Sequence, residues 1–478
     1  MKHTTHILTI AALLGFVSGA SMAACVREVP NPEHCSVQGG DASCVERFGA
    51  ERAHCAQFGC SDEPWGCVAE LPEPSCHSPC GGELEDSTCL TGDTETESGE
   101  EGPACADDGD CSGSKPFCVA GECGDCSQTQ DPDAACAESS RGATPVCAAA
   151  QCVECSVEQV GACIDTAPIC DPATNTCVGC DYHEQCPAGA CQVLTGSCLP
   201  DNRIWHVDGD GGQDFLQISQ ALLQIKTGES GTLIIHERSG GVAYDEAIVI
   251  GDARIVALIA APGERPLLDN ADGTTLWVDL DSEVYLEGLD ITGIEPLVVD
   301  NATLYLDRTQ VRGTVNPGVW LENDARMFAR NAILLSSVSQ DFGGSAIAAS
   351  NSRFELSYST VIGRGGFSAI GCDLAAGSSA RNSLIASENA EPAVACPDIA
   401  LLNNALEDAT DYPDNVGIGE LQAEWFVGGA NYHLSDMAPA AIHTAAIWQS
   451  GDPHVDFDGD PRPTRAGAPD FAGADVLP

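Results

Sequence analysis

Leu276-Trp-Val-Asp279 and Leu297-Val-Val-Asp300 are the first two members of a repeated, strand-like segment in the second half of the chain. Four later segments align with them, at Val319-Trp-Leu-Glu322, Ile347-Ala-Ala-Ser350, Ile370-Gly-Cys-Asp373 and Val394-Ala-Cys-Pro397. The steps between successive segments are 21, 22, 28, 23 and 24 residues. A period of roughly two dozen residues with one short strand at a fixed phase indicates a solenoid, in which each repeat forms one coil.

A second strand phase follows the first in most of these repeats. Its segments begin at Leu286, Leu306, Arg330, Arg381 and Leu402. Helical spacing of apolar residues occurs once, from Phe215 to Ile225, behind a turn rich in Gly and Asp. The sequence therefore predicts a mostly β parallel β-helix with an N-terminal capping helix.

Only two cysteines, Cys372 and Cys396, lie in this half of the chain, and they occupy the same phase of consecutive repeats. Equivalent residues of stacked coils lie about 4.8 Å apart, within the Cα separation of about 4.4–6.8 Å that a disulfide tolerates. We therefore expect these two residues to form a disulfide that joins the last coils.

The other 25 of the 27 cysteines lie between Cys25 and Cys198. Sixteen of them form four successive groups of four: Cys105, Cys111, Cys118, Cys123; Cys126, Cys136, Cys147, Cys152; Cys155, Cys163, Cys170, Cys177; and Cys180, Cys186, Cys191, Cys198. This repetition predicts small tandem modules, each closed by two internal disulfides, and leaves all three possible pairings open. The Cys-x-x-Cys spacing between groups also fits zinc, but disulfides are the simpler interpretation for an exported chain.

Nine cysteines precede these groups, and an odd number leaves one unpaired, intermolecular or modified. Met22-Ala23-Ala24-Cys25 resembles a bacterial lipobox, although Met22 stands where leucine is usual and no flexible tether follows. Two interpretations stay open: Cys25 is lipidated, or it forms an ordinary disulfide and Cys89 is free.

The N-terminus predicts export. Lys2 and His3 precede an apolar run from Ile7 to Val17 that ends in small residues, as in a signal peptide. No later segment reaches the roughly 18 apolar residues of a transmembrane helix. The expected order is a signal peptide at 1–24, a cysteine-rich domain at 25–83, an acidic linker at 84–104, four-cysteine repeats at 105–200 and the β-helix at 201–478. The expected location is extracellular or on the bacterial cell surface.

The formal net charge is −52, from 72 acidic and 20 basic residues. Binding to nucleic acid or to an anionic membrane depends on lysine and arginine. The composition therefore argues against those partners and favours cations.

The region from about residue 204 onward resembles the pectin-lyase-like right-handed parallel β-helix superfamily. The resemblance rests on Ile204-Trp-His-Val-Asp-Gly-Asp-Gly-Gly before the capping helix, on Asp456-Phe-Asp-Gly-Asp-Pro-Arg-Pro, and on Asp470-Phe-Ala-Gly-Ala-Asp475. It implies the fold more strongly than a function, because the same coil carries lyases, hydrolases, esterases and non-catalytic surface proteins.

Catalytic motifs of that superfamily are not evident in the sequence. The motifs of polygalacturonase-like hydrolases are missing, no histidine lies between His236 and His433, and Gln340-Asp341 is too short to carry an esterase motif. A lyase would need a basic residue, usually with calcium. The sequence offers Arg308, Arg330 and Arg381 as candidate bases without selecting one.

The strongest constellation is acidic. Asp279, Asp300 and Glu322 share one phase in three consecutive repeats, with Asp373 two repeats further on. Carboxylates stacked about 5 Å apart do not all remain ionised at low cost, so one pKa rises or a cation lies among them. Calcium would suit this ladder, a glycosidase pair is a second interpretation, and acids facing water at a turn are the simplest.

Asp456, Asp458 and Asp460 alternate as in a calcium loop, but Gly459 is misplaced for an EF-hand. Aspartates beside Gly459 and Pro461 are more simply turn formers.

Two functional hypotheses follow. The first is a secreted or cell-surface binding or structural protein, whose β-helix presents a surface to a glycan or a protein. The second is a polysaccharide lyase or glycoside hydrolase that acts through the acidic ladder. The absence of family catalytic motifs favours the first.

Overall fold

The structure is a computed structural model that describes residues 44, 54–56, 67–68, 105–164, 167–186, 189–336, 344–388, 392–428 and 432–477. The chain divides into two compact units, Met1–Gly102 and Pro103–Pro478. The predicted signal peptide, Cys25, the linker at 84–104 and Gln340-Asp341 lie outside the described residues. In the first unit, β1 (His54–Cys55) pairs antiparallel with β2 (Cys67–Val68), and Cys44 is bonded to Cys67.

Four small modules begin the second unit, each built on a short antiparallel hairpin. The hairpins are β3 (Phe117–Val119) with β4 (Glu122–Gly124), β5 (Val146–Ala148) with β6 (Gln151–Val153), β7 (Ile169–Asp171) with β8 (Thr176–Val178), and β9 (Cys191–Gln192) with β10 (Ser197–Cys198). The short helices are η2 (Asp108–Asp110), η3 (Cys126–Gln128), α3 (Pro132–Ser139), η4 (Val160–Ala162) and η5 (His183–Gln185). Asp131 caps α3 by accepting a hydrogen bond from the backbone N–H of Ala134, and Pro132 occupies its first turn.

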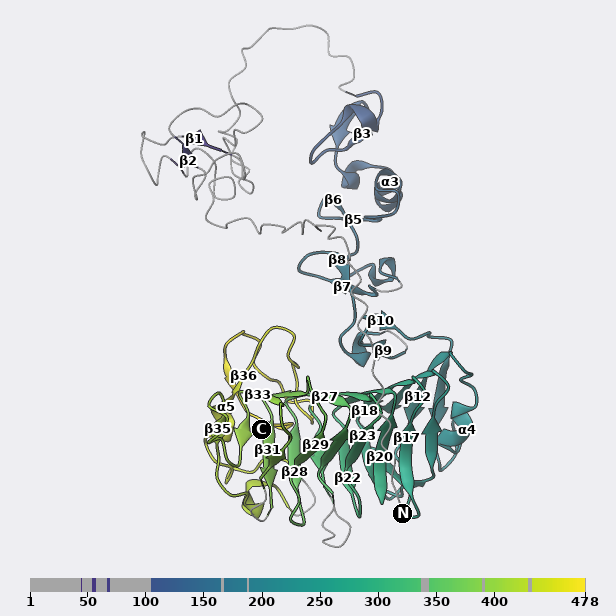
Figure 1. Ribbon diagram of the computed structural model, residues 1–478. Coiled ribbons are helices and arrows are strands. Elements are labelled where there is room, and N and C mark those ends of the chain that lie inside the picture. The colour runs from purple at the N-terminus through teal and green to yellow at the C-terminus, as the bar shows by residue number, and fades with distance from the viewer. Residues whose placement is uncertain are drawn as a thin grey trace, which may run out of the picture. The chain divides into compact units, whose positions relative to one another are not determined.

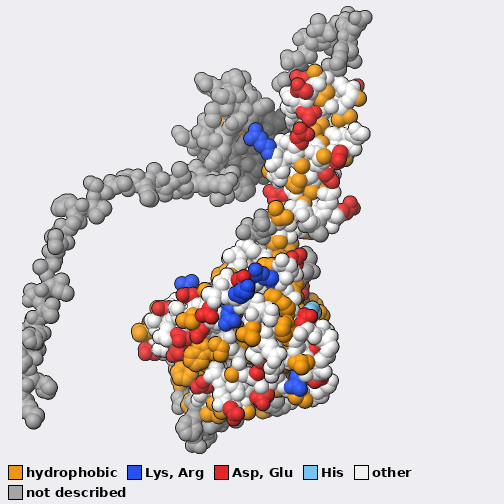
Figure 2. Space-filling view, turned by 90° about the vertical axis from the view of Figure 1, so that its right-hand side faces the viewer, with side chains coloured by type: hydrophobic (Ala, Val, Ile, Leu, Met, Phe, Trp, Pro, Cys, Tyr) orange, Lys and Arg blue, Asp and Glu red, His pale blue; other side chains and the backbone are white. Residues whose placement is uncertain are grey.

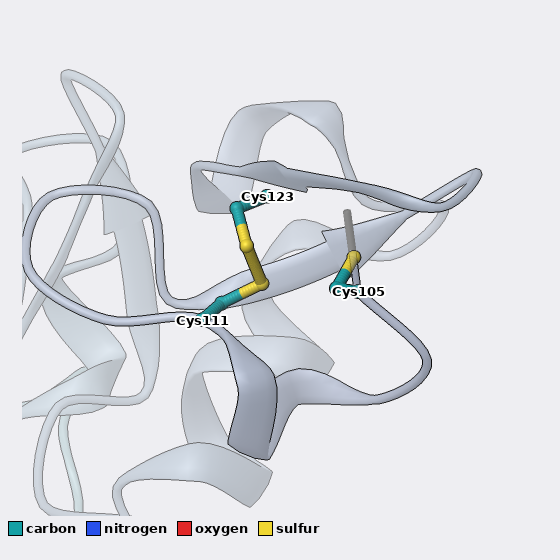
Figure 3. Close-up of side chains that lie close together, drawn as sticks. All are labelled: Cys105, Cys111 and Cys123. Atoms are coloured by element: carbon teal, nitrogen blue, oxygen red, sulfur yellow. A yellow bond between two sulfur atoms is a disulfide. The ribbon is translucent and has the colours of Figure 1, made fainter. Parts of the chain in front are cut away.

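Disulfides close every module in one pattern, which the sequence left open. The first cysteine of each group is bonded to the third and the second to the fourth, for example Cys105 to Cys118 and Cys111 to Cys123. Figure 3 shows the Cys111–Cys123 bond with Cys105 beside it. Because all sixteen sulfur atoms are bonded in pairs, none of these cysteines is a free thiolate for zinc.

Three parallel sheets form the walls of the β-helix that follows (Figure 1). Sheet 1 consists of β14 (Ile248–Ile250), β17 (Thr274–Val278), β20 (Glu295–Asp300), β23 (Val319–Glu322), β26 (Ile347–Ser350), β29 (Ile370–Asp373) and β32 (Val394–Ala395). Sheet 2 consists of β11 (Ile204–Val207), β12 (Ser230–Ile235), β15 (Ile255–Ala260), β18 (Glu283–Glu287), β21 (Thr303–Asp307), β24 (Arg326–Arg330), β27 (Arg353–Ser357), β30 (Ser379–Arg381) and β33 (Ala400–Leu402). Sheet 3 consists of β13 (Tyr244–Asp245), β16 (Leu267–Asp269), β19 (Asp290–Gly293), β22 (Gln310–Gly313), β25 (Ile333–Leu335), β28 (Thr360–Gly363), β31 (Leu384–Ser387), β34 (Ala405–Leu406) and β35 (Val416–Gly417).

The parallel β-helix predicted from the sequence is therefore confirmed. The predicted register of the first strand phase, which forms sheet 1, is confirmed as well. Leu276 pairs with Leu297, and the same column continues through Val319, Ile347, Ile370 and Val394. The alignment of the second phase was wrong by one residue at one step. Arg330 pairs with Asp307, whereas the sequence alignment placed it beside Leu306.

A left-handed residue turns the chain from sheet 2 into sheet 3 in six consecutive coils. The six residues are Gly288, Arg308, Asn331, Tyr358, Asn382 and Asn403, with φ between 46° and 71°. Each of them directly follows the last residue of a strand in sheet 2. Those last residues pair with one another from coil to coil: Glu287, Asp307, Arg330, Ser357, Arg381 and Leu402. Glycine and asparagine adopt this conformation at low cost, which explains why they occupy four of the six positions.

The core is a continuous column of inward-facing Leu, Ile, Val and Ala residues. At its N-terminal end, α4 (Ile218–Leu222) buries Ile218, Ala221 and Leu222 against the first coils. This capping helix is shorter than the predicted span of Phe215 to Ile225. Figure 1 places α4 at the opposite end of the solenoid from β35.

After the last coil the chain covers the outer face of sheet 3. This C-terminal segment contains η6 (Ala423–Trp425), α5 (Ile442–Ala445), β36 (Ala446–Ile447) and β37 (Pro469–Asp470). Its apolar side chains, including Trp425, Trp448 and Phe457, pack on outward residues of sheet 3 such as Ile333 and Leu384. Sheet 3 is thus covered on its outer face from β25 to β34, and sheet 1 and part of sheet 2 are left to present an outer surface.

The fourth module packs against the first half of sheet 2. Ala190 and Leu199 form one apolar cluster with Ala257 and Tyr285. Glu184 pairs with Arg308 of the β-helix, and Gln192 donates a hydrogen bond to Glu283 at 3.1 Å. Side-chain contacts therefore cross the boundary expected at residue 200.

Among the described residues, no helix is long and apolar enough to cross a membrane. The disulfides of the modules are typical of proteins that work outside the reducing cytosol.

Candidate functional site

The acidic ladder lies on the outer face of sheet 1. Asp300 and Glu322 are register partners in β20 and β23. Asp279 directly follows Val278, which pairs with Val299, the residue before Asp300. Leu276 and Val278 point into the core, and because side chains alternate along a strand, Asp279 points outward. The structure thus brings together the three carboxylates that the sequence placed in one phase.

The fourth member, Asp373, is separated from the other three. Ser350 stands between Glu322 and Asp373 in the same column, and both Ser350 and Asp373 are exposed. Asp373 therefore has no carboxylate neighbour on the adjacent coil.

Burial and mutual repulsion perturb the ladder. Burial raises the pKa of Asp279, and the Asp300 carboxylate raises it further. The pKa of Glu322 is raised by burial and then by Asp300 and Glu295. Asp300 accepts a hydrogen bond from the side-chain amide of Asn323 at 2.8 Å. The middle carboxylate is therefore hydrogen-bonded, and its charge favours the protonated forms of both neighbours.

Two tryptophans stand beside these acids, and the sequence analysis did not single them out. Trp277, Val298 and Trp320 are register partners on the outer face of sheet 1, two residues before the acidic column. Trp320 is 38% exposed and Val298 only 4% exposed, because the larger tryptophans stand on either side of it. We call these three residues the tryptophan strip. It was visible in the repeat alignment, where Trp277 and Trp320 both hold the second position of their segments.

The described residues give no geometric support to calcium at the ladder. A group of three ligand atoms all within 4.8 Å of one another occurs at His433, Asp458 and Asp475 in the described part of the chain, and not at Asp279, Asp300 and Glu322. Calcium takes six to eight oxygen ligands. The ladder alone would supply too few, so a bound ion would need water or the ligand to complete its shell.

The aspartates at 456, 458 and 460 do not converge on one site. Asp456 is buried, and its carboxylate accepts hydrogen bonds from the backbone N–H groups of Asp458, Asp460 and Val476 at 2.8–3.0 Å. Asp458 instead pairs with His433 at 2.6 Å. This arrangement is that of a turn held by its own side chain.

The three candidate lyase bases are all held in ion pairs. Arg308 contacts Glu184 and Glu287, and Arg381 contacts the buried Asp452. Arg330 lies 2.8 Å from Asp307. Burial opposes the charge of Arg330, but Asp307 beside it raises the pKa, and the hydrogen bond to Asp452 raises that of Arg381. Arg330 and Arg381 are thus made poorer bases by the carboxylates beside them.

Charge is unevenly distributed over the face of the molecule that Figure 2 shows. Acidic side chains are scattered there over the modules and the β-helix, whereas the fewer basic side chains lie mainly on the β-helix. On sheet 1, the tryptophan strip lies beside the acidic ladder.

Comparisons with known proteins add little on function. The profile of a family of unknown function (DUF8331) matches residues 92–204, which include the four modules. No curated protein matches the chain. Among solved structures, the crystal structure of pectate lyase Pel9A is similar at 12% sequence identity and a TM-score of 0.33, over 58% of this chain and 96% of that one. The β-helix is established by the three parallel sheets themselves.

Proposed function

We propose that this protein is an exported, non-catalytic binding protein of the bacterial cell surface or its surroundings, and that sheet 1 presents the tryptophan strip and the acidic ladder to a glycan. The observation that carries the proposal is the exposed Trp320 aligned with Trp277 beside a column of carboxylates. Exposed apolar patches with polar borders mark interaction sites. Carboxylates accept hydrogen bonds from hydroxyl groups, which a glycan supplies in number.

A binding role fits the site better than catalysis. The arginines that could have served as lyase bases are tied to carboxylates, and the ladder lacks a neighbouring basic residue within its own column. The disulfide-bonded modules supply a compact support that resists unfolding without a large core.

One observation favours a glycoside hydrolase as the second candidate. Asp279 and Glu322 have raised pKa values on either side of Asp300, and a general acid needs a raised pKa. Neighbouring strands place carboxyl groups about 4.8 Å apart, close to the roughly 5–5.5 Å of retaining enzymes.

The test is to incubate the oxidised protein with neutral and acidic polysaccharides, with and without calcium, and to measure both binding and the release of reducing or unsaturated ends. We expect binding without release. The Trp320→Ala variant should bind about tenfold more weakly, while Met437→Ala, which removes a more exposed apolar side chain from the C-terminal segment, should bind normally.

Release of chain ends that disappears in Asp300→Asn would make the protein an enzyme and overturn the proposal. The absence of both binding and release across the panel would exclude the glycan role and leave a structural or protein-binding function.

A further inference from the structure

A second surface of the β-helix, on the outer face of sheet 2, holds an aromatic stack that ends abruptly. Tyr285, Tyr305 and Phe328 are register partners in three consecutive coils. Their ring centroids are 4.6 and 4.8 Å apart, and the rings are nearly parallel, at 13° and 8°. The same column continues with Glu355 and Ser379, so no ring follows Phe328.

A cavity of about 240 Å³ runs along this column, from the fourth module and Tyr285 past Phe328 to Arg381. Beyond Phe328 it is lined by the small side chains of Ser357 and Ser379. Sites for drug-sized ligands have volumes of about 300–1,000 Å³, whereas an apolar cavity of about 150 Å³ accommodates benzene. The volume therefore suits one ring with a substituent.

Two arginines supply donors for an anion at this cavity. Arg330 and Arg381 line it, and each is paired with one carboxylate: Arg330 with Asp307, which also lines the cavity, and Arg381 with Asp452. The Nη1 atom of Arg381 is buried and has no hydrogen-bond partner. A buried donor without an acceptor is costly, and a carboxylate is the acceptor that a guanidinium binds best.

Two further arginines strengthen the positive potential nearby. Arg326 and Arg353 are exposed register partners on the same face, and neither forms an ion pair with another described residue. Two carboxylates line the cavity, Asp307, which is paired with Arg330, and Glu355, which can accept a hydrogen bond from a ligand hydroxyl group.

We propose that this cavity binds a single-ring carboxylate, with the flat face of its ring on Phe328 and its carboxylate at Nη1 of Arg381. The site is separate from the tryptophan strip and the acidic ladder, because it lies on sheet 2. Aromatic acids and sugar acids share the required chemistry, namely a ring with an apolar face and one carboxylate.

The proposal is tested by titrating the full chain with benzoate and D-glucuronate, and with benzyl alcohol and D-glucose as neutral counterparts, using calorimetry or NMR. At least one carboxylate should bind, and at least about tenfold more tightly than its neutral counterpart. Binding of benzoate identifies the ligand as an aromatic acid, and binding of D-glucuronate identifies it as a sugar acid.

Three variants examine the geometry. Ser357→Leu fills the cavity, Phe328→Ala removes the ring face, and Arg381→Lys keeps the charge beside Asp452 but removes Nη1. Each should weaken binding about tenfold or more with an unchanged circular dichroism spectrum, whereas Met437→Ala in the C-terminal segment, outside both surfaces, should leave binding unchanged. The proposal would be overturned if neither carboxylate bound, or if the neutral compounds bound equally well. It would also be overturned if the Ser357→Leu variant folded and still bound with full affinity.

Discussion

Cys372 in β29 and Cys396, two residues beyond Val394 in β32, are bonded to each other across one coil, with their Cα atoms 4.6 Å apart. This separation is close to the spacing of neighbouring strands, about 4.8 Å. The bond therefore links two coils at the place where their strands already lie.

Removal of this disulfide should destabilise the C-terminal coils. The bond closes a loop of 24 residues, for which a loss of about 2–4 kcal/mol in the free energy of unfolding is expected. The Cys372→Ser/Cys396→Ser double variant isolates the effect, because a reducing agent would also open the modules. Chemical denaturation that gave the same midpoint for variant and wild type would contradict this expectation.

Arg462 should be among the most sensitive residues of the C-terminal segment. It is 3% exposed, pairs with Asp470 at 3.3 Å and lies over the ring of Tyr358. It also donates to the carbonyl oxygens of Gly473 and Ala474.

Arg462→Met leaves Asp470 buried without its partner and should cost about 3–5 kcal/mol of stability. Arg465→Met, at an exposed position three residues later, is the matched control and should cost less than about 0.5 kcal/mol. Thermal unfolding of both variants measures the difference, and equal melting temperatures would refute the assigned role of Arg462.

Stability should fall at alkaline pH because of His433. Hydrogen bonds to Asp458 and then to Asp475 raise the pKa of His433 to about 9 from its ordinary value of 6.5. The protonated imidazole therefore stabilises the fold fully below pH 6.5, and the contribution is lost as the pH rises through 9. Asp458 is 44% exposed, so solvent screening reduces the effect to about 1–2 kcal/mol.

Urea denaturation of the wild type and of His433→Gln at pH 6.5, 8 and 9.5 measures this contribution. The free energy of unfolding of the wild type should exceed that of the variant at pH 6.5, and the difference should shrink as the pH rises to 9.5. A constant difference between the two proteins would show that the imidazole does not titrate as described.

Neutralising one carboxylate of the acidic ladder should stabilise the chain slightly. The raised pKa of Asp279 means that its ionised form destabilises the fold at neutral pH, and that stability is regained only as the pH falls through the folded-state pKa. Asp279→Asn should therefore raise the free energy of unfolding at pH 7, by less than about 1 kcal/mol.

Calcium should not act through the ladder, because the oxygen atoms of Asp279, Asp300 and Glu322 do not converge on one point. Millimolar calcium is expected to change the melting temperatures of the wild type and of Asp279→Asn equally, with magnesium as the comparison ion. A larger rise for the wild type would make the ladder a cation site.

The fourth module should be needed for the stability of the β-helix. Without it, the buried Tyr285 and Ala257 of sheet 2 would face water. A chain that starts at Cys180 should therefore melt several degrees above a chain that starts at Asp201. Equal melting temperatures would show that the contacts of the module contribute little.

The sequence predicted the first strand phase well, because the inward residues there are Leu, Val or Ile at a nearly constant interval. The second phase was harder. Alanine replaces leucine at the inward position in β24, and the neighbouring Leu306 misled the alignment by one residue. Small inward residues carry too weak a hydrophobic signal to fix a register.

The outward surfaces were the least predictable part. The acidic column was found because its residues follow the strands in register, and the tryptophans could have been found in the same way. By contrast, the packing of the fourth module on Tyr285 and that of the C-terminal segment on Ile333 depend on contacts between residues far apart in sequence. Neither segment has a periodicity that would reveal its partner.

The C-terminal segment that covers sheet 3 is synthesised after the coils on which it packs. Arg462 contacts Asn331 and Tyr358, and the backbone N–H of Gly473 donates to the carbonyl oxygen of Asn382, in each case a residue about a hundred positions earlier in the chain. A ribosome makes the coils first, so they must stack while their outer apolar wall is still open to water and to other chains. The interval before the cover is made is therefore the period in which the nascent protein is most exposed to misassembly, and the period in which a chaperone would be of most use to it.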